Sequence, residues 1–329
     1  MDFTFVYQIF LSVLSLLILV VPCFILAKSG TIGEGAEKAL SAVVLYVCQP
    51  TMLFMSFQKT AFSTEIIVNM LVVFGLALAV HGVMIAIVVL AFRGTDARKR
   101  CLRFSSVFSN CGYMGIPFLQ MLYGGSAIIG EITVYAGVVI GAFNLLAWTV
   151  GVYLMTGDKR EMSVKKAVLN PNIIALTLGV LLFVTIKRPF TELAADGSEL
   201  DAATEKLVKS LIFFSDMVTP LSMSVIGIKL SKISVKKLFA SGSAYVAAAM
   251  KLIVMSVVTT LVVAFLPVSE SVKNVLFFTL SMPTATMTVL LSVRYDSDAE
   301  SATANVLLST ALSVATVPLM YMLFSILST

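Results

Sequence analysis

The sequence has little charge. Asp, Glu, Lys and Arg together make up 12% of its 329 residues, whereas 59% are hydrophobic and the mean hydropathy is +1.00. That composition excludes both a soluble globular chain and a disordered one, and the long hydrophobic runs indicate a polytopic membrane protein. The net charge is +5. Because the basic residues lie in short loops between the runs, membrane topology accounts for them, and we expect no nucleic-acid partner.

Residues that carry catalytic chemistry are also scarce. The chain has a single histidine, His81, and its four cysteines form no CxxC pair, so neither a disulfide framework nor a metal site is indicated. Asp216 is the one acid placed well inside a predicted span, which excludes the buried carboxylate pair of a sodium-proton antiporter. No Ser-His, Asp-Asp or HExxH pattern is present. We therefore predict a protein that is not an enzyme and holds no cofactor.

The hydrophobic pattern predicts ten spans, each near the length that a bilayer core requires. They cover residues 4–27, 40–58, 65–92, 104–122, 130–154, 171–187, 207–229, 238–266, 273–293 and 301–327. The loops after the odd-numbered spans hold 16 Lys and Arg residues and the opposite side holds 6. The positive-inside rule then predicts a multi-pass protein of the cell membrane with both termini extracytoplasmic.

The ten spans divide into two similar halves. When the chain is shifted by about 170 residues, Pro50 falls on Pro220 and Arg103 on Lys273. Each half, residues 1–154 and 171–329, holds five spans, and an odd number of spans inserts the second half in the opposite sense. The predicted fold is an all-α membrane protein of two inverted five-helix repeats, which suits alternating access.

Two spans in matching positions contain helix-breaking residues. The fourth holds Asn110-Cys-Gly-Tyr-Met-Gly-Ile-Pro117, and the ninth holds Ser281-Met-Pro283, with the prolines 166 residues apart. We expect each proline to force the residue before it, Ile116 and Met282, into an extended conformation. The half-helices that begin at Pro117 and Pro283 would then point their positive ends at a shared spot near the midplane. Such a spot suits a carboxylate.

The alternative is that each proline only kinks its helix, which is our interpretation for Pro50, Pro220 and Pro318. Polar residues around Pro117 and Pro283 favour a site, and Asn144 in the fifth span is a further candidate, whereas Asn305 in the tenth more simply holds helices together. The predicted substrate-binding residues are Asn110, Gly112, Tyr113, Gly115, Pro117, Asn144, Ser281, Pro283, Thr284 and Thr286.

Two ionisable residues, His81 and Lys251, lie deep in spans 3 and 8 and coincide under a shift of 170 residues. Charge at that depth is costly and suggests function, so either could supply a positive charge or a titrating proton beside the crossing. The alternative is that Lys251 snorkels to the interface and His81 makes a satisfied polar contact.

The same segments resemble those of a known family. The stretch NCGYMGIPFL (110–119), the seventh-span stretch TPLSMSVIGIKL (219–230) and the run from Ser281 to Leu319 are similar to the auxin efflux carrier family, which includes plant PIN carriers and bacterial permease-like members for malate and malonate. The resemblance covers the whole chain. It implies ten helices in two inverted repeats with broken crossover helices 4 and 9. It also implies a dimerising scaffold of spans 1, 2, 6 and 7, and an elevator-type transport domain of spans 3–5 and 8–10.

By this resemblance, Asn110 and the two prolines form the crossover site, and Asn144 matches a polar position near the bound carboxylate. The plant carriers have an acid and a lysine in span 3, where this sequence has His81. The coupling ion, a proton or a sodium ion, therefore stays open.

These observations predict a secondary transporter of small organic anions in the lipid bilayer. An apolar pocket would fit a monocarboxylate, whereas Lys251 near the crossing would favour a dicarboxylate. The alternative function is a membrane sensor that binds a ligand without moving it.

Overall fold

The computed structural model describes residues 3–189, 199–232 and 241–328, and within these ranges the chain is helical with short connections and no strand longer than an isolated bridge. Residues 190–198, about half of the connection between the predicted spans 171–187 and 207–229, and the first residues of the span predicted at 238–266 lie outside the described residues.

Ten elements, three of them single π-helical turns (η), make up the chain as far as residue 151. They are α1 (Phe3–Lys28), α2 (Ala36–Val43), η1 (Val44–Cys48), α3 (Gln49–Gln58), α4 (Thr64–Ala91), α5 (Ala97–Val107), η2 (Cys111–Gly115), α6 (Ile116–Tyr123), α7 (Ile129–Leu146) and, directly after it, η3 (Ala147–Gly151). The chain then runs through α8 (Val152–Thr156), the short 3₁₀ turn η4 (Lys159–Glu161), α9 (Val164–Val168) and α10 (Pro171–Ile186).

The remaining described helices contain one more π-helical turn. They are α12 (Glu199–Asp216), α13 (Val218–Ser231), α15 (Gly242–Ala249), η5 (Met250–Val254), α16 (Met255–Val263), α17 (Glu270–Ser281), α18 (Met287–Arg294) and α19 (Ala299–Ser328).

Polar caps fix where several of these helices begin. The side chains of Asp96, Asn170 and Ser269 each accept a hydrogen bond from a backbone N–H in the first turn of α5, α10 and α17. The first N–H groups of a helix have no partner within the helix, so these caps satisfy them and set the start of each segment.

Seven helical stretches among the described residues are long and apolar enough to cross a bilayer, and a bent pair, 159–168 with 171–186 at 41°, raises the number to eight. The predicted spans 104–122 and 273–293 do not count as single helices because each is split in two. The predicted span 207–229 is two helices, α12 and α13, which meet at Met217. The ten-span arrangement therefore stays a prediction.

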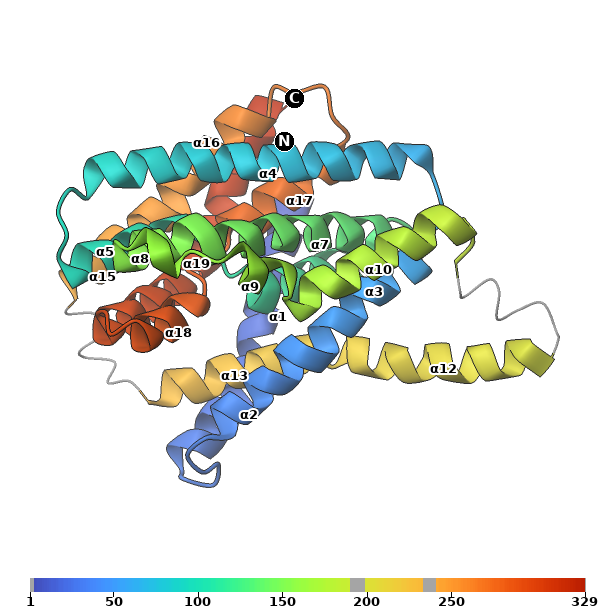
Figure 1. Cartoon of the computed structure of the whole chain (residues 1–329), viewed down its shortest axis with the longest axis horizontal. Helices are drawn as coiled ribbons and strands as arrows, with labels where there is room; N and C mark the ends of the chain where they lie inside the picture. Colours follow the sequence, from blue (N-terminus) through green and yellow to red (C-terminus); the bar gives the residue numbers. More distant parts are fainter. Residues whose placement is uncertain (1–2, 190–198, 233–240, 329) are drawn as a thin grey trace.

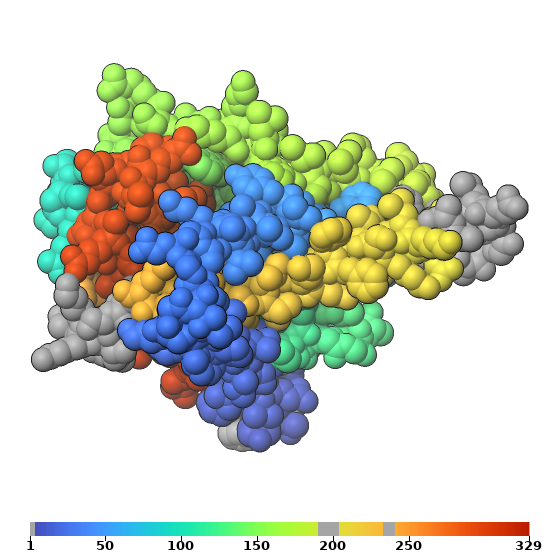
Figure 2. Space-filling model, turned by 90° about the horizontal axis from the view of Figure 1, so that it is seen from below, coloured from blue at the N-terminus to red at the C-terminus, as the bar shows by residue number. Residues whose placement is uncertain are grey.

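The helices pack in two groups. In one, α1 packs along α13, and α3 packs against α10 and α12; in Figure 2 the first helices and α12–α13 lie side by side on one face. In the other, α4 packs on α7 and α16, and α5 and α15 pack on α19 (Figure 1). The rings of Phe5 and Tyr321 are 5.3 Å apart, so the two ends of the chain lie on the same side of the molecule, as an even number of spans requires.

Candidate functional site

Two broken segments from the two halves of the chain cross at the centre of the second group. The helix α5 ends at Val107 and α17 ends at Ser281. Between each of them and the helix that follows, the chain is not helical over residues 108–110 and 282–286, and Phe108 and Met282 are extended. The Asn110 N–H donates to the Pro283 carbonyl (2.7 Å), and the Ala285 N–H donates to the Phe108 carbonyl (2.8 Å). We call these two paired segments the crossover.

The second helix breaks before Pro283 as predicted, but the half-helix after it, α18, begins at Met287 and not at the proline, and the first break lies elsewhere than predicted. Met282 is extended (φ −59°, ψ 153°), as expected before Pro283. Ile116 is helical (φ −65°, ψ −51°), so the expectation that the first half-helix begins at Pro117 was wrong. It begins at Cys111, six residues earlier.

A π-helical turn explains how Pro117 fits inside the helix. In η2 the Gly115 N–H donates to the Asn110 carbonyl (3.0 Å), five residues back. The wider turn changes the hydrogen-bond register just before the proline, whose ring lacks a donor and crowds the preceding turn. The turn η1 precedes Pro50 at the same spacing, so the two prolines are accommodated in the same way.

The start of the half-helix Cys111–Tyr123 is surrounded by hydrogen-bond donors. Its first N–H groups have no partner within the helix and carry the positive end of its dipole. The Gln49 side chain packs on Gly112 so closely that a Cβ added to this glycine would lie 2.4 Å from Gln49 Nε2. Gln49 Nε2 and Asn110 Nδ2 are both buried, and neither has an acceptor among the described residues. Buried donors without acceptors are costly, so this arrangement is typical of an anion site.

A chain of amides holds Gln49 in this position. Asn172 Nδ2 donates to Gln49 Oε1 (3.0 Å), and the Asn172 backbone N–H donates to Asn170 Oδ1 (2.9 Å). Asn170 Nδ2 in turn donates to Asn144 Oδ1 (3.1 Å). Since the oxygen of Gln49 is occupied, its NH₂ group is the end that remains free to donate. We call Asn144, Asn170, Asn172 and Gln49 the amide chain.

Asn144 itself is therefore separated from the free Gln49 donor by Asn170 and Asn172. Its Nδ2 donates to the Ile140 carbonyl of its own helix (2.9 Å), and its oxygen is taken by Asn170. In the described contacts this side chain links α7 to the start of α10. Its role in substrate binding stays a prediction.

The other predicted residues lie on both sides of the crossover. The Tyr113 hydroxyl donates to the Ser41 carbonyl of α2 (3.3 Å), and a Cβ on Gly115 would be 3.4 Å from Met282. Thr284 is fully engaged, since its N–H donates to Ser309 Oγ (3.1 Å) and its hydroxyl to the Ser105 carbonyl (3.0 Å). The hydroxyl of Ser281 is buried and has no partner among the described residues, and Thr286 is buried at the start of α18.

The two predicted ionisable residues differ in their surroundings. His81 is buried on α4; its Nδ1 lies 2.7 Å from the Ala77 carbonyl, its Nε2 has no partner in the described structure, and its ring contacts Phe108 of the crossover. Lys251 is fully buried and donates to oxygens of both broken helices. It does not snorkel to the surface.

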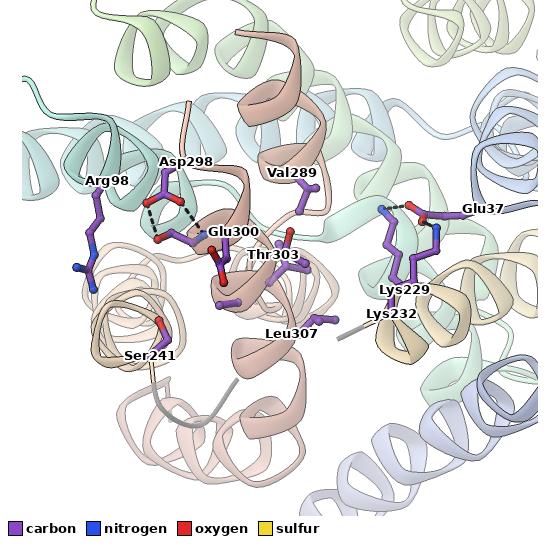
Figure 3. Close-up of a pocket in the computed structure, with 13 residues that line it drawn as sticks. Glu37, Arg98, Lys229, Lys232, Ser241, Val289, Asp298, Glu300, Thr303 and Leu307 are labelled. Atoms are coloured by element: carbon purple, nitrogen blue, oxygen red, sulfur yellow. Dashed lines mark hydrogen bonds and ion pairs between the residues drawn. The ribbon is translucent and has the colours of Figure 1, made fainter. Parts of the chain in front are cut away.

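A cavity of about 790 Å³ is lined by α2 and α13 on one side and by α5, α18 and α19 on the other (Figure 3). Its first wall carries Glu37 of α2, which pairs with Lys229 (3.5 Å) and Lys232 (2.9 Å) at the end of α13. Its other wall is formed by residues of α5, α18 and α19, with Thr303 and Leu307 among them. The loops beside these walls, which follow predicted spans 1, 3, 7 and 9, all belong to the side predicted to be cytoplasmic. We call this cavity the vestibule.

Sequence reasoning missed Gln49, Asn170 and Asn172. The available signal was an amide in an otherwise apolar run, VLYVCQPTMLF, because a polar side chain at that depth needs a partner or a role.

A bundle of bilayer-length helices with paired broken segments at its centre and an unsatisfied donor site beside them defines a multi-span membrane protein of the transporter class. The sequence model of one family, described as "Membrane transport protein", matches residues 8–167 and 158–321, and the chain belongs to that family. The resemblance to auxin efflux carriers is thereby confirmed.

Two archaeal relatives are similar over nearly the whole chain. An uncharacterized transporter of Methanocaldococcus jannaschii is 25% identical over 310 residues, which covers 93% of this chain and 96% of the relative. An uncharacterized transporter of Methanothermobacter thermautotrophicus is 24% identical over 318 residues, which covers 94% and 96%.

Proposed function

We propose that the protein is a secondary transporter of small organic carboxylates, and that it binds the carboxylate at the start of the half-helix Cys111–Tyr123. The observation that carries this proposal is the Gln49 amide, whose NH₂ group is packed on Gly112 without an acceptor among the described residues. A carboxylate has only acceptors, so it would satisfy Gln49 Nε2, Asn110 Nδ2 and the free backbone N–H groups at once.

The surroundings support a monocarboxylate with an apolar body. Next to Gly112, Tyr113 packs with Val44 and Val225 in a small apolar cluster. The buried cation, Lys251, directs its donors to oxygens at the other ends of the broken helices. The Lys251 ammonium is thus engaged by oxygens of the chain and is not free to hold a second carboxylate, which counts against the dicarboxylate alternative.

We further propose ten spans in two inverted repeats. Two of the ten proposed spans are split helices, α5 with η2–α6 and α17 with α18. They are added to the spans that single long helices make. The antiparallel pairing of Ser109 with Thr284, from corresponding parts of the two halves, is what an inverted repeat would produce.

The proposed mechanism is alternating access by movement of one helix group against the other. The vestibule lies between these groups, so sliding them past each other would open or close it. The acidic and basic side chains that line the vestibule are equal in number, and Glu37 among them is paired with Lys229 and Lys232. Selection for an anion would therefore occur at the half-helix start rather than at the entrance.

Counterflow in proteoliposomes tests this function. Vesicles loaded with an unlabelled carboxylate should accumulate the labelled one, in a panel that includes benzoate as an aromatic monocarboxylate and malate as a dicarboxylate. Exchange requires movement across the bilayer, whereas a sensor would show saturable binding alone.

The decisive variant is Gly112→Ala. Its Cβ would displace the Gln49 amide, so we expect a loss of exchange of about 10-fold or more, in line with the removal of hydrogen bonds to a charged group. Gly82→Ala in α4 is the matched control, since nothing lies within 4 Å of its added Cβ. Equal exchange by both variants, or no exchange of any carboxylate by the native protein, would contradict the proposal.

A further inference from the structure

Lys251 lies at the negative, C-terminal ends of two helices at the crossover, whereas the proposed carboxylate lies at the positive, N-terminal end of a half-helix. It lies on the π-helical turn η5, with a fully buried side chain. Its Nζ donates to the Val107 carbonyl (3.3 Å) at the end of α5 and to the Leu280 carbonyl (2.9 Å) at the end of α17. These last carbonyls carry the negative ends of the two half-helix dipoles.

A third oxygen completes the set around the ammonium group. Lys251 Nζ also donates to Ser109 Oγ, and the Ser109 hydroxyl donates onward to the Leu280 carbonyl (2.7 Å), so a lone pair of this oxygen is free to face the lysine. An ammonium has three donors, and here each has an acceptor. Among the described residues no carboxylate lies within ion-pair distance of Nζ, so the helix ends and the hydroxyl balance the charge.

Two carbonyls and a hydroxyl, drawn from two broken helices, are also the oxygen ligands that would suit a sodium ion. In transporters with discontinuous helices, unwound carbonyls and the C-terminal ends of half-helices coordinate the coupling cation. In this chain oxygens of that kind accept hydrogen bonds from the ammonium group of Lys251.

We propose that Lys251 is a covalently attached counter-cation that replaces a coupling sodium ion at the crossover. The transport cycle then needs no sodium, and the crossover keeps its geometry because its cation is part of the chain. Truncation of the side chain would open a site that sodium or a small amine could enter. This inference extends the proposed function, yet it concerns the fold of the crossover and can be tested without knowledge of the substrate.

The first test uses the native protein. Its apparent Tm in detergent, and its exchange rate if a substrate is in hand, should be the same in sodium chloride and in an equal concentration of choline chloride. A rise in Tm or rate that is specific to sodium would overturn the proposal, because the cation site would then still be open.

The second test uses Lys251→Ala. In choline chloride its Tm should fall by about 5 °C or more, since two helix ends lose their cation. Sodium or methylammonium chloride should restore a large part of this loss, while choline, which is too large for the space, should not. A merely structural lysine would give a loss that no cation relieves, and that result would overturn the proposal.

Lys273→Ala is the matched control. Lys273 Nζ also donates to backbone carbonyls, those of Ala264 (2.8 Å) and Ser328 (3.4 Å), but away from the crossover and only partly buried. We expect no sodium-specific recovery in this variant. If Lys251→Ala fails to fold, Ser109→Ala keeps the ammonium and removes one ligand, and its Tm should remain independent of sodium; dependence on sodium would contradict the proposal. Because Tm needs no substrate, failure of the carboxylate assignment would leave these outcomes unchanged.

Discussion

The side-chain amides of Gln49 and Asn144 differ in how many of their hydrogen-bonding groups are occupied, so their substitution should have different effects on binding. Gln49 presents a free NH₂ group, whereas the amide of Asn144 is engaged at both ends. Substitution at Gln49 should therefore affect the ligand directly, and substitution at Asn144 should act through the position of its neighbours.

We predict that Gln49→Met weakens carboxylate binding about 10-fold and that Gln49→Glu weakens it about 100-fold, because methionine removes the donors and glutamate also adds a repelling negative charge. The measurement is the thermal shift of each purified variant against increasing concentrations of the carboxylate that stabilises the native protein most. If glutamate binds as well as methionine, the ligand carries no negative charge at this position.

Residue types alone located part of this site. Asn110, Gly112 and Pro283 could be found because polar or helix-breaking residues are costly within a membrane span. Gln49 could not be matched to them, since it is 63 positions from Gly112 in the chain and only helix packing brings the two together. The free end of the Gln49 amide depends in turn on Asn172, which belongs to a third helix.

At the scale of elements, the sequence placed most helices within a few residues, because long apolar runs are unambiguous. The predicted 65–92 is α4 at Thr64–Ala91, and the predicted 301–327 is α19 at Ala299–Ser328. The error at Pro117 has a physical cause. A π-helical turn before a proline can absorb the missing donor inside a helix, so a proline does not by itself mark the break.

The contact between α1 and α13 gives a prediction at this scale. These helices approach so closely at Gly227 that an added Cβ would lie 2.4 Å from the Val20 carbonyl oxygen and 2.9 Å from the Phe24 nitrogen. Both are backbone atoms and cannot rotate away. Gly227→Ala should therefore force the helices apart and lower the stability by about 1–3 kcal/mol, as overpacking does.

The measurement is the Tm of detergent-purified Gly227→Ala beside that of Gly75→Ala. Gly75 is also helical, and its added Cβ meets nothing within 4 Å. We expect a clear drop in Tm for the first variant and little change for the second. Equal melting of both would mean that α1 and α13 do not pack this tightly in the membrane.

At the scale of the whole molecule, the charge bias and the structure agree on one point. Both ends of the chain lie on the same side, through the contact of Phe5 with Tyr321, and the vestibule opens among loops of the side rich in Lys and Arg. The basic residues alone set the direction of insertion, because the contact between the two chain ends is the same in either orientation.

We predict that the vestibule is open to the cytoplasm and the termini are outside. In a variant whose four native cysteines are replaced by alanine or serine, Thr303→Cys on the vestibule wall should react with a membrane-impermeant maleimide in inside-out vesicles and hardly at all in intact cells. Leu308→Cys on the same helix is the matched control, since Leu308 is fully buried and should be unreactive in both. A protease-sensitive tag at the C-terminus should be cleaved in intact cells.

If Thr303→Cys instead reacts from outside, the topology is inverted and the vestibule is the extracytoplasmic entrance. If it reacts from both sides, the same residue samples both openings, as alternating access requires.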